Sequence, residues 1–293
     1  MAIKTRPLTD ADRERVMRAI QRDEFDETQP LFAPDSITRR VHHEAALLLG
    51  GGRALMMQIA HPLVAEGVAR FSNFRKDPLG RLWRTLELTL TVSFRSAAEA
   101  VAAVNAIDRA HARVHGELSE RVGPFPAGTR FDGLDPDLMF WVHATLVDSA
   151  MLVYERFVAP LTAAEKTAYY EESKVTARMM GIDEARIPRT LTEFRKYMRE
   201  MLRSDTLSVG TAGRDVANAV LYPSRPAGLS PALLPARLLT FEILPPVLRE
   251  RFGLFTPPML GPAVTAVGEI SRLVLPWVPQ SLRAMPYTPG AWL

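Results

Sequence analysis

The feature that most constrains this chain is the spacing of its apolar residues, which recur every three or four positions through most of residues 10–221. Apolar residues at this spacing lie along one face of an α-helix. Strict alternation of apolar and polar residues, the pattern of a half-buried strand, is not sustained in any part of the sequence. We therefore predict an all-α fold built from many helices.

Short motifs mark where individual helices begin. Ser96 with Glu99 and Thr162 with Glu165 form capping boxes, in which two residues three apart satisfy each other's backbone N–H groups. The glycines at 50–52 either break a helix or let another group approach the backbone closely. The expected helices lie at residues 38–60 (with an interruption at 50–52), 63–71, 78–93, 97–118, 136–158, 163–180, 192–202 and 211–221.

The prolines divide the chain into parts, because 13 of the 23 fall between Pro223 and Pro289. We expect an N-terminal helix and loop at 1–36, a helical core at 37–222, and a Pro-rich extension of short helices at 223–293 packed on the core. The alternative is that this extension touches a membrane surface with an amphipathic face. Packing on the core is favoured because the Lys and Arg density needed for lipid binding is low.

Composition excludes several classes of site and partner. The chain has no Cys, so disulfides, thiolate zinc sites, iron–sulfur clusters and thiolate-ligated haem are excluded. The net charge is only +3, and no basic stripe with interleaved aromatic residues is present, so we expect no nucleic-acid partner. The N-terminus has no long apolar stretch and no window suits a transmembrane segment, which predicts a cytoplasmic protein.

Six histidines could carry redox or metal chemistry, and His111 is the first candidate. Helical spacing places it on a stripe with Val104, Ile107 and Val114, so an imidazole emerges from an apolar face. Such an imidazole could be an axial ligand of haem iron. The alternative, which is commoner, is a buried histidine whose ring is hydrogen-bonded to a backbone carbonyl. His115 lies four residues on and could share a metal with His111, but a position beside the helix end explains it as well.

Two further histidines and one helix face are also candidates. His61 precedes Pro62, where a kink could direct its side chain into a cavity or into a junction hydrogen bond. His143 lies among apolar residues of a helix and either lines a pocket or bonds within the core. One helical face carries Arg81, Arg84 and Thr85, which could bind haem propionates or polarise dioxygen. Without other information, a pair of solvated arginines beside a hydroxyl is the better interpretation of this face.

Several segments together resemble a known family in order and spacing. They are GGRALMMQIAHP (51–62), RLWRT (81–85), HARVHG (111–116), DP (135–136), WVHAT (141–145) and YE (154–155). The chain is similar, over about residues 37–202, to the bacterial branch of the superfamily that contains latex clearing proteins (rubber oxygenases) and MpaB-type oxygenases. The resemblance implies a globin-related helical core that holds haem b, with its iron, through a single proximal histidine.

The resemblance also implies roles for individual residues. His111 matches the proximal iron ligand, and Arg81, Arg84 and Thr85 match the distal face. From their own positions in the sequence, His61 and His143 are further candidates for binding the cofactor. Arg84 stands where the family has Lys, and a guanidinium is bulkier and permanently charged.

The expected function is that of a haem b-dependent oxygenase-like oxidoreductase acting on a small apolar substrate with dioxygen. The resemblance also implies a glutamate base, for which Glu66 and Glu87 are candidates. Rubber cleavage itself is not implied, because latex clearing enzymes are exported and we expect no export signal here. The alternative function is that of a helical protein which binds haem or a hydrophobic ligand without turnover.

Overall fold

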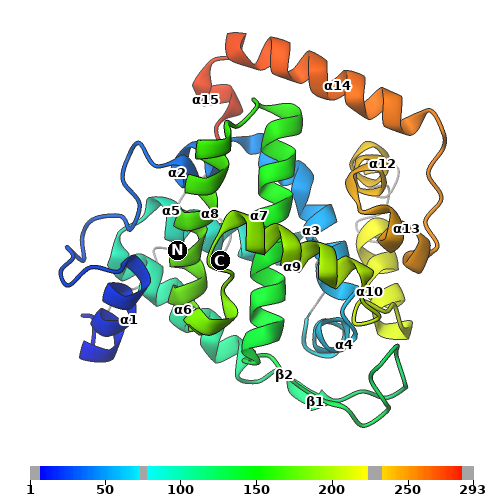
Figure 1. Ribbon diagram of the computed structural model, residues 1–293, viewed down its shortest axis with the longest axis horizontal. Coiled ribbons are helices and arrows are strands. Elements are labelled where there is room, and N and C mark those ends of the chain that lie inside the picture. Colours follow the sequence, from blue (N-terminus) through cyan, green and yellow to red (C-terminus); the bar gives the residue numbers. More distant parts are fainter. Residues whose placement is uncertain (1–6, 73–77, 224–232, 286–293) are drawn as a thin grey trace.

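The computed structural model describes residues 7–72, 78–223 and 233–285, and their regular secondary structure is almost all helix (Figure 1), which confirms the all-α prediction. The first part of the chain contains α1 (Asp10–Ile20), α2 (Ile37–His42), the 3₁₀ helix η1 (Ala45–Gly50), α3 (Gly51–Ile59), α4 (Pro62–Phe71), α5 (Pro78–Phe94) and α6 (Ala97–His111). It continues with β1 (His115–Glu117), β2 (Arg130–Asp132), α7 (Pro136–Phe157), α8 (Ala163–Met179), η2 (Glu184–Arg186), α9 (Leu191–Arg203) and α10 (Thr211–Leu221). The C-terminal elements are α12 (Leu234–Ile243), α13 (Pro246–Phe252), α14 (Leu260–Val274), η3 (Leu275–Trp277) and α15 (Gln280–Arg283).

The predicted caps are present at the helix starts. The N–H of Thr162 donates to Glu165 Oε2 at 2.7 Å, and the N–H of Glu165 donates back to Thr162 Oγ1 at 3.2 Å. Ser96 and Glu99 make the same reciprocal pair at the start of α6. These bonds satisfy N–H groups that a helix leaves without partners in its first turn.

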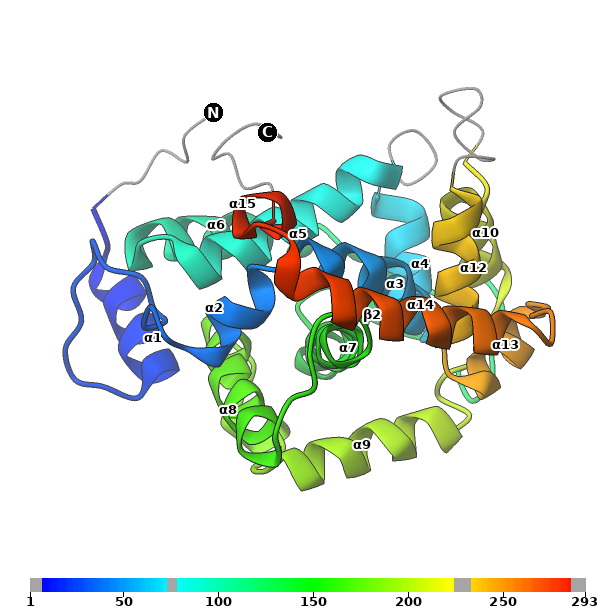
Figure 2. The ribbon, with the colours of Figure 1, turned by 90° about the horizontal axis from the view of Figure 1, so that it is seen from above.

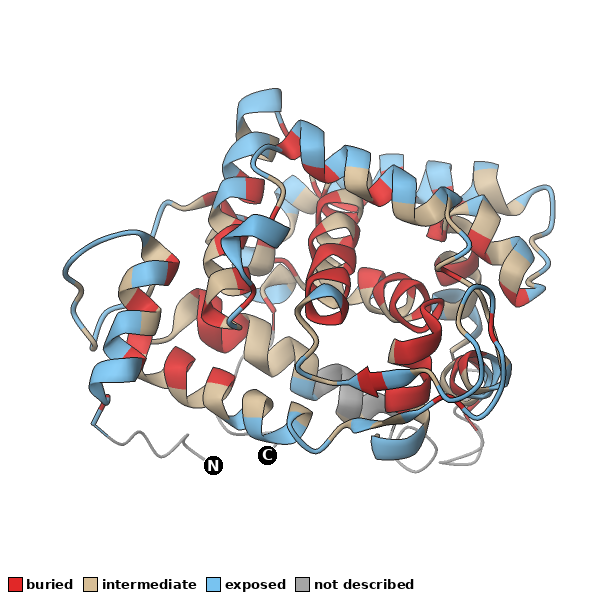
Figure 3. Cartoon of the chain, turned by 60° about the horizontal axis from the view of Figure 1, so that its bottom comes forward, coloured by how far each residue is buried: buried red, intermediate tan, exposed pale blue. Residues whose placement is uncertain are grey.

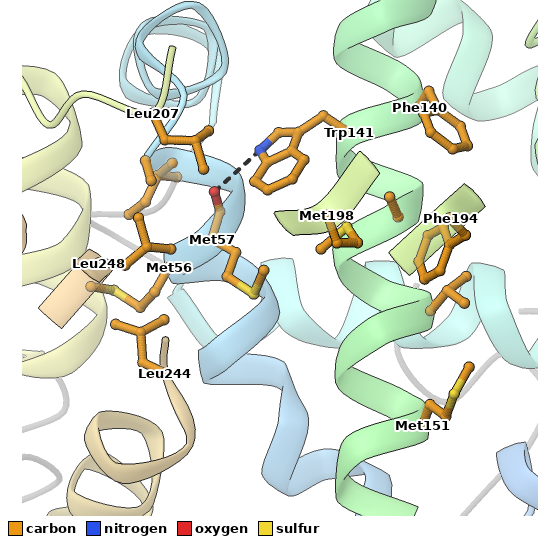
Figure 4. Packing of buried hydrophobic residues seen from close by; sticks show 14 of the residues in the cluster. Met56, Met57, Phe140, Trp141, Met151, Phe194, Met198, Leu207, Leu244 and Leu248 are labelled. Atoms are coloured by element: carbon orange, nitrogen blue, oxygen red, sulfur yellow. Dashed lines mark hydrogen bonds between the residues drawn. The ribbon is translucent and has the colours of Figure 1, made fainter. Parts of the chain in front are cut away.

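Helix α7 is the centre of the fold. Seen nearly end-on in Figure 2, it is surrounded by the other helices, with α5 and α6 on one side and α9 on the opposite side. Its side chains contribute much of the main core, and Trp141 is among the largest fully buried residues. The indole N–H of Trp141 donates to the carbonyl of Met57 at 3.2 Å (Figure 4), which ties α7 to α3 and leaves no polar atom of the indole unsatisfied.

The glycines at 50–52 interrupt the helix and also allow a close contact with the backbone, the two roles expected for them. The chain passes from η1 into α3 at Gly50 and Gly51, and the Thr240 side chain lies in the space that a Cβ on Gly52 would occupy. This contact brings α12 directly onto the backbone of α3.

Next to these glycines, Arg53 is buried and joins three helices. Its guanidinium donates to Asp148 Oδ2 at 2.6 Å, to Ser149 Oγ at 2.7 Å and to the carbonyl of Ile243 at 2.9 Å. The bonds link α3 to α7 and to the end of α12.

The prediction of a helix at 97–118 is wrong beyond His111. The chain leaves α6 there, and His115–Glu117 forms an antiparallel ladder with Arg130–Asp132, in which His115 pairs with Asp132. Close packing stabilises the ladder, because a Cβ on Gly116 would lie 2.9 Å from Cζ of Phe131. A continued helix could not present Gly116 to Phe131 in this way.

The C-terminal helix α14 lies along the outside of the molecule. Its buried residues are Val264 and Gly268, and a Cβ on Gly268 would lie 2.7 Å from the carbonyl oxygen of Arg156 in α7. Figure 3 shows that most of α14 is exposed, whereas α7 is buried along much of its length. Over the described ranges, every helix is too short or too polar to traverse a lipid bilayer.

Candidate functional site

The helices α5 and α6 form a hairpin that places two of the sequence motifs at one end. The connection at Arg95 and Ser96 is short, and the two helices pack against each other (Figure 2). Arg84 and Thr85 lie in the first half of α5, and His111 is the last residue of α6. The hairpin therefore brings RLWRT and His111 to the end that is distant from the connection.

His111 is half-buried, and its Nδ1 atom is shielded from solvent. Its carbonyl accepts a hydrogen bond from the N–H of Val114 at 2.8 Å. The segment after β2 packs against this carbonyl, because a Cβ on Gly133 would lie 2.7 Å from the oxygen. The backbone that carries the imidazole is thus fixed from two sides.

On α5, Arg84 is exposed and Thr85 is half-buried, with the Thr85 carbonyl accepting from the Thr89 hydroxyl at 3.0 Å. The side chain of Arg81 lies outside the described residues. Glu87, two residues beyond Thr85, is half-buried on the same helix.

His61 is buried at the start of α4, where Pro62 is the first helical residue. Its ring lies beside Phe125, with 5.4 Å between the ring centroids. Burial lowers the pKa of His61 to about 4, so the ring is neutral at pH 7. Within the described part of the chain its Nδ1 atom is buried and has no hydrogen-bond partner, whereas buried polar atoms in folded proteins almost always have one.

His143 is buried in the first half of α7, with its ring 6.4 Å from that of Phe140. Burial lowers its pKa to about 4, so this ring is also neutral at pH 7. The pKa of His42 at the end of α2 is lowered to about 4 by burial and, secondarily, by the nearby His143.

His42 belongs to a hydrogen-bonded chain that spans three helices. Its Nδ1 lies 2.7 Å from the Ser93 hydroxyl of α5, and its Nε2 lies 3.0 Å from the Tyr169 hydroxyl of α8. Ser93 donates its own proton to the carbonyl of Thr89 at 2.7 Å, so it accepts from His42. His42 is therefore protonated on Nδ1, and Tyr169 donates to Nε2.

The sequence did not indicate this chain of bonds. His42 is the last residue of α2, and its partners Ser93 and Tyr169 are 51 and 127 residues away along the sequence. Neither residue has a local motif that would pair it with a histidine.

The remaining candidates fall into different environments. Glu66 on α4 is buried, and its Oε1 accepts from Nε of Arg70 at 2.8 Å. The idea that His115 could share a metal with His111 on one helix face is wrong, because His115 is exposed on β1. Across the ranges that the structure describes, no three His or carboxylate side chains gather as a metal-binding group.

Comparison with known protein families shows which family the chain resembles. The family model described as "ER-bound oxygenase mpaB/B'/Rubber oxygenase, catalytic domain" matches residues 38–272. No curated protein and no solved structure matches the chain. The matched region includes α3 to α10, and therefore the hairpin and all of the histidines discussed above. Because this match covers most of the chain, the protein belongs to the family of the mpaB and rubber oxygenase catalytic domain.

Proposed function

We propose that this chain is a haem b-dependent oxygenase in which His111 is the protein ligand of the iron. The observation that carries the proposal is the α5–α6 hairpin, which brings His111 to the same end as Arg84 and Thr85. An imidazole could hold haem iron, and nearby hydrogen-bond donors such as a guanidinium and a hydroxyl would tune the binding and activation of dioxygen there. The chain's membership of an oxygenase family supports the proposal that it is an oxygenase.

The residues about the hairpin fit a haem group. The orphaned Nδ1 of His61 is a buried polar atom that a bound group could satisfy, and the residues of the adjoining cluster are apolar, as the lining of a porphyrin site would be. A porphyrin supplies four nitrogen ligands itself, so one histidine from the protein is sufficient. We assign that role to His111, and the lining of the cofactor pocket to His61 and His143.

When bound, haem iron would supply the binding and activation of dioxygen. The guanidinium of Arg84 could donate hydrogen bonds to negative charge that would develop near it during the reaction. The Thr85 hydroxyl adds a neutral donor one residue on. His61 and His143, neutral at pH 7, line the interior without adding charge there.

The substrate that these surroundings favour is small and apolar. The cluster beside His61 consists of Leu63, Leu118, Phe131 and Leu138, with Val64, Val114 and Phe125 packed against it. Such side chains bind hydrocarbon surface and offer no hydrogen bond. Glu66 and Glu87 are the candidates for a base, and Glu66 is the more buried of the two.

Two histidine variants test the ligand assignment. His111→Ala should lose most of the haem that the parent chain retains after desalting, with its helical circular dichroism unchanged. His115→Ala is the matched control, because His115 is exposed and only four residues away, and it should retain haem as the parent does. Equal haem content in the parent and in both variants would show that His111 is not the ligand.

A further inference from the structure

The outer face of α14 is an apolar surface that no part of the described chain covers. The helix contacts α7 through Val264 and Gly268, and the hydroxyl of Ser271 donates to the carbonyl of Phe157 at 2.6 Å. Figure 1 shows α14 lying along the edge of the molecule, with its other side turned away from the bundle. On that side Ile270 is 60% exposed, Leu273 is 73% exposed and Trp277 is 86% exposed.

The exposed apolar residues follow the spacing of a helix-pairing seam. They are, in order along the helix and into η3, Ala263, Ala266, Ile270, Leu273 and Trp277. The steps of three and four residues are those of the inner positions of a coiled coil. The seam is also nearly symmetric about Ile270, because Ala263 and Trp277 lie seven residues away on either side and Ala266 and Leu273 lie four and three residues away.

Charged residues are nearly absent from this surface. Between residues 260 and 277 the chain has one Glu and one Arg, Glu269 and Arg272. An amphipathic helix that binds lipid headgroups carries many Lys and Arg residues on its polar face. Depletion of charge around exposed aromatic and aliphatic residues is instead the composition of a protein–protein interface core.

The size of the surface also suits a protein partner. At their exposed fractions, Val267, Ile270, Leu273, Val274 and Trp277 present on the order of 600 Å² of apolar area, at the upper end of what a monomer shows. Each partner in a standard interface contributes about 800 Å². The α14 face therefore accounts for most of one side of such an interface.

We propose that α14 is a homodimer interface, in which two copies of the chain pack their α14 helices antiparallel about a two-fold axis near Ile270. A two-fold axis makes one patch contact its own copy, and a seam that is symmetric about its midpoint is complementary to itself in that orientation. In this arrangement Val267 of one copy lies level with Leu273 of the other, since both are three residues from Ile270. Trp277 then packs near Ala263, which leaves room for the indole.

The first test is the mass of the full chain in solution. Light scattering coupled to gel filtration should give twice the chain mass of 32.6 kDa for the parent and 32.6 kDa for Ile270→Glu and Leu273→Glu. Leu134→Asp, which places a charge on another exposed apolar residue, is the matched control and should remain dimeric. A parent that stays at 32.6 kDa at ~100 μM, far above the Kd of a specific interface, would overturn the proposal.

The second test uses the absence of native Cys, since a single introduced thiol is then unique in each copy. With oxidised glutathione as the oxidant, Ile270→Cys should form an intermolecular disulfide, as two thiols lose their hydrogens to the reagent. In the antiparallel pair the two residues at position 263 are ~20 Å apart along the helices, beyond the ~7 Å limit for a disulfide. Ala263→Cys should therefore remain uncrosslinked.

Other outcomes would contradict the arrangement in distinct ways. Crosslinking of both Cys variants would indicate parallel helices and overturn the antiparallel geometry. A monomeric parent that sediments with vesicles of phosphatidylglycerol, and loses this binding in Leu273→Glu, would show that lipid is the occupant of the face. Neither result bears on haem binding, which is measured separately by absorption.

Discussion

Gly133 packs against the backbone of His111 so closely that a Cβ on residue 133 would lie 2.7 Å from the His111 carbonyl oxygen. The obstruction is backbone, which cannot rotate away as the end of a long side chain can. The position of the proposed iron ligand is therefore set partly by the segment after β2, and only partly by α6 itself. Gly133 lies 22 residues after His111 in the sequence, and because it has no side chain it leaves space for the end of α6.

The first prediction follows from this contact. Gly133→Ala should destabilise the chain by about 1–3 kcal/mol through overpacking and should weaken haem retention by displacing His111. Thermal unfolding and the haem absorbance after desalting measure the two effects. The control is Gly261→Ala, whose Cβ would meet the movable end of the Glu242 side chain at 3.2 Å and should change neither quantity by much.

A second prediction concerns the bond between His42 and Tyr169. Tyr169→Phe removes the donor to Nε2 of His42 and leaves that buried nitrogen unsatisfied, which should lower the free energy of unfolding by about 1–3 kcal/mol. Urea denaturation gives the difference. Tyr222→Phe removes the same hydroxyl from a half-exposed ring and should leave stability within about 0.5 kcal/mol of the parent; equal effects in the two variants would argue against the bond.

Arg53 supports a third prediction. Arg53→Met keeps much of the side-chain length but removes the bonds to Asp148, Ser149 and the Ile243 carbonyl, and should cost about 2–3 kcal/mol. Arg130→Met breaks an ion pair whose arginine side chain is 89% exposed, and should cost almost nothing. Comparable denaturation midpoints for these two variants would contradict the structural role of Arg53.

The fourth prediction is a pH dependence of stability. The folded chain keeps His42, His61 and His143 neutral down to a pKa of about 4, whereas these groups in the unfolded chain protonate near 6.5. Between these values the unfolded state binds more protons, so stability is fully present above pH 6.5 and is lost as the pH falls toward 4. His143→Leu should flatten the slope of unfolding free energy against pH in this window, and an unchanged slope would show that His143 titrates normally in the folded chain.

The helices were predictable where their signals are local. The capping residues at Ser96 and Thr162 and the proline after Asp135 lie within a few residues of the turns that they stabilise, and α10 occupies the predicted residues 211–221. The segment 112–118 was not predictable as strand, because its conformation depends on contacts with Phe131 and Gly133 that are formed only in the folded chain.

In the candidate site, too, the sequence indicated some of the residues and not others. The motifs pointed to His111, His61 and His143, and the fold places His61 and His143 in the interior with His111 half-buried at the end of α6. The role of His42 was not visible, since its partners Ser93 and Tyr169 come from two other helices. Tertiary hydrogen bonds of this kind have no sequence spacing by which they could be recognised.

Whether this chain uses haem is decided by the absorption spectrum of the purified, haem-supplemented protein. We expect a sharp Soret band distinct from that of free haem, which shifts on reduction with dithionite and shifts again when dioxygen is admitted. A spectrum that matches free haem in buffer under all three conditions would contradict the assignment of His111 and the proposed oxygenase function together.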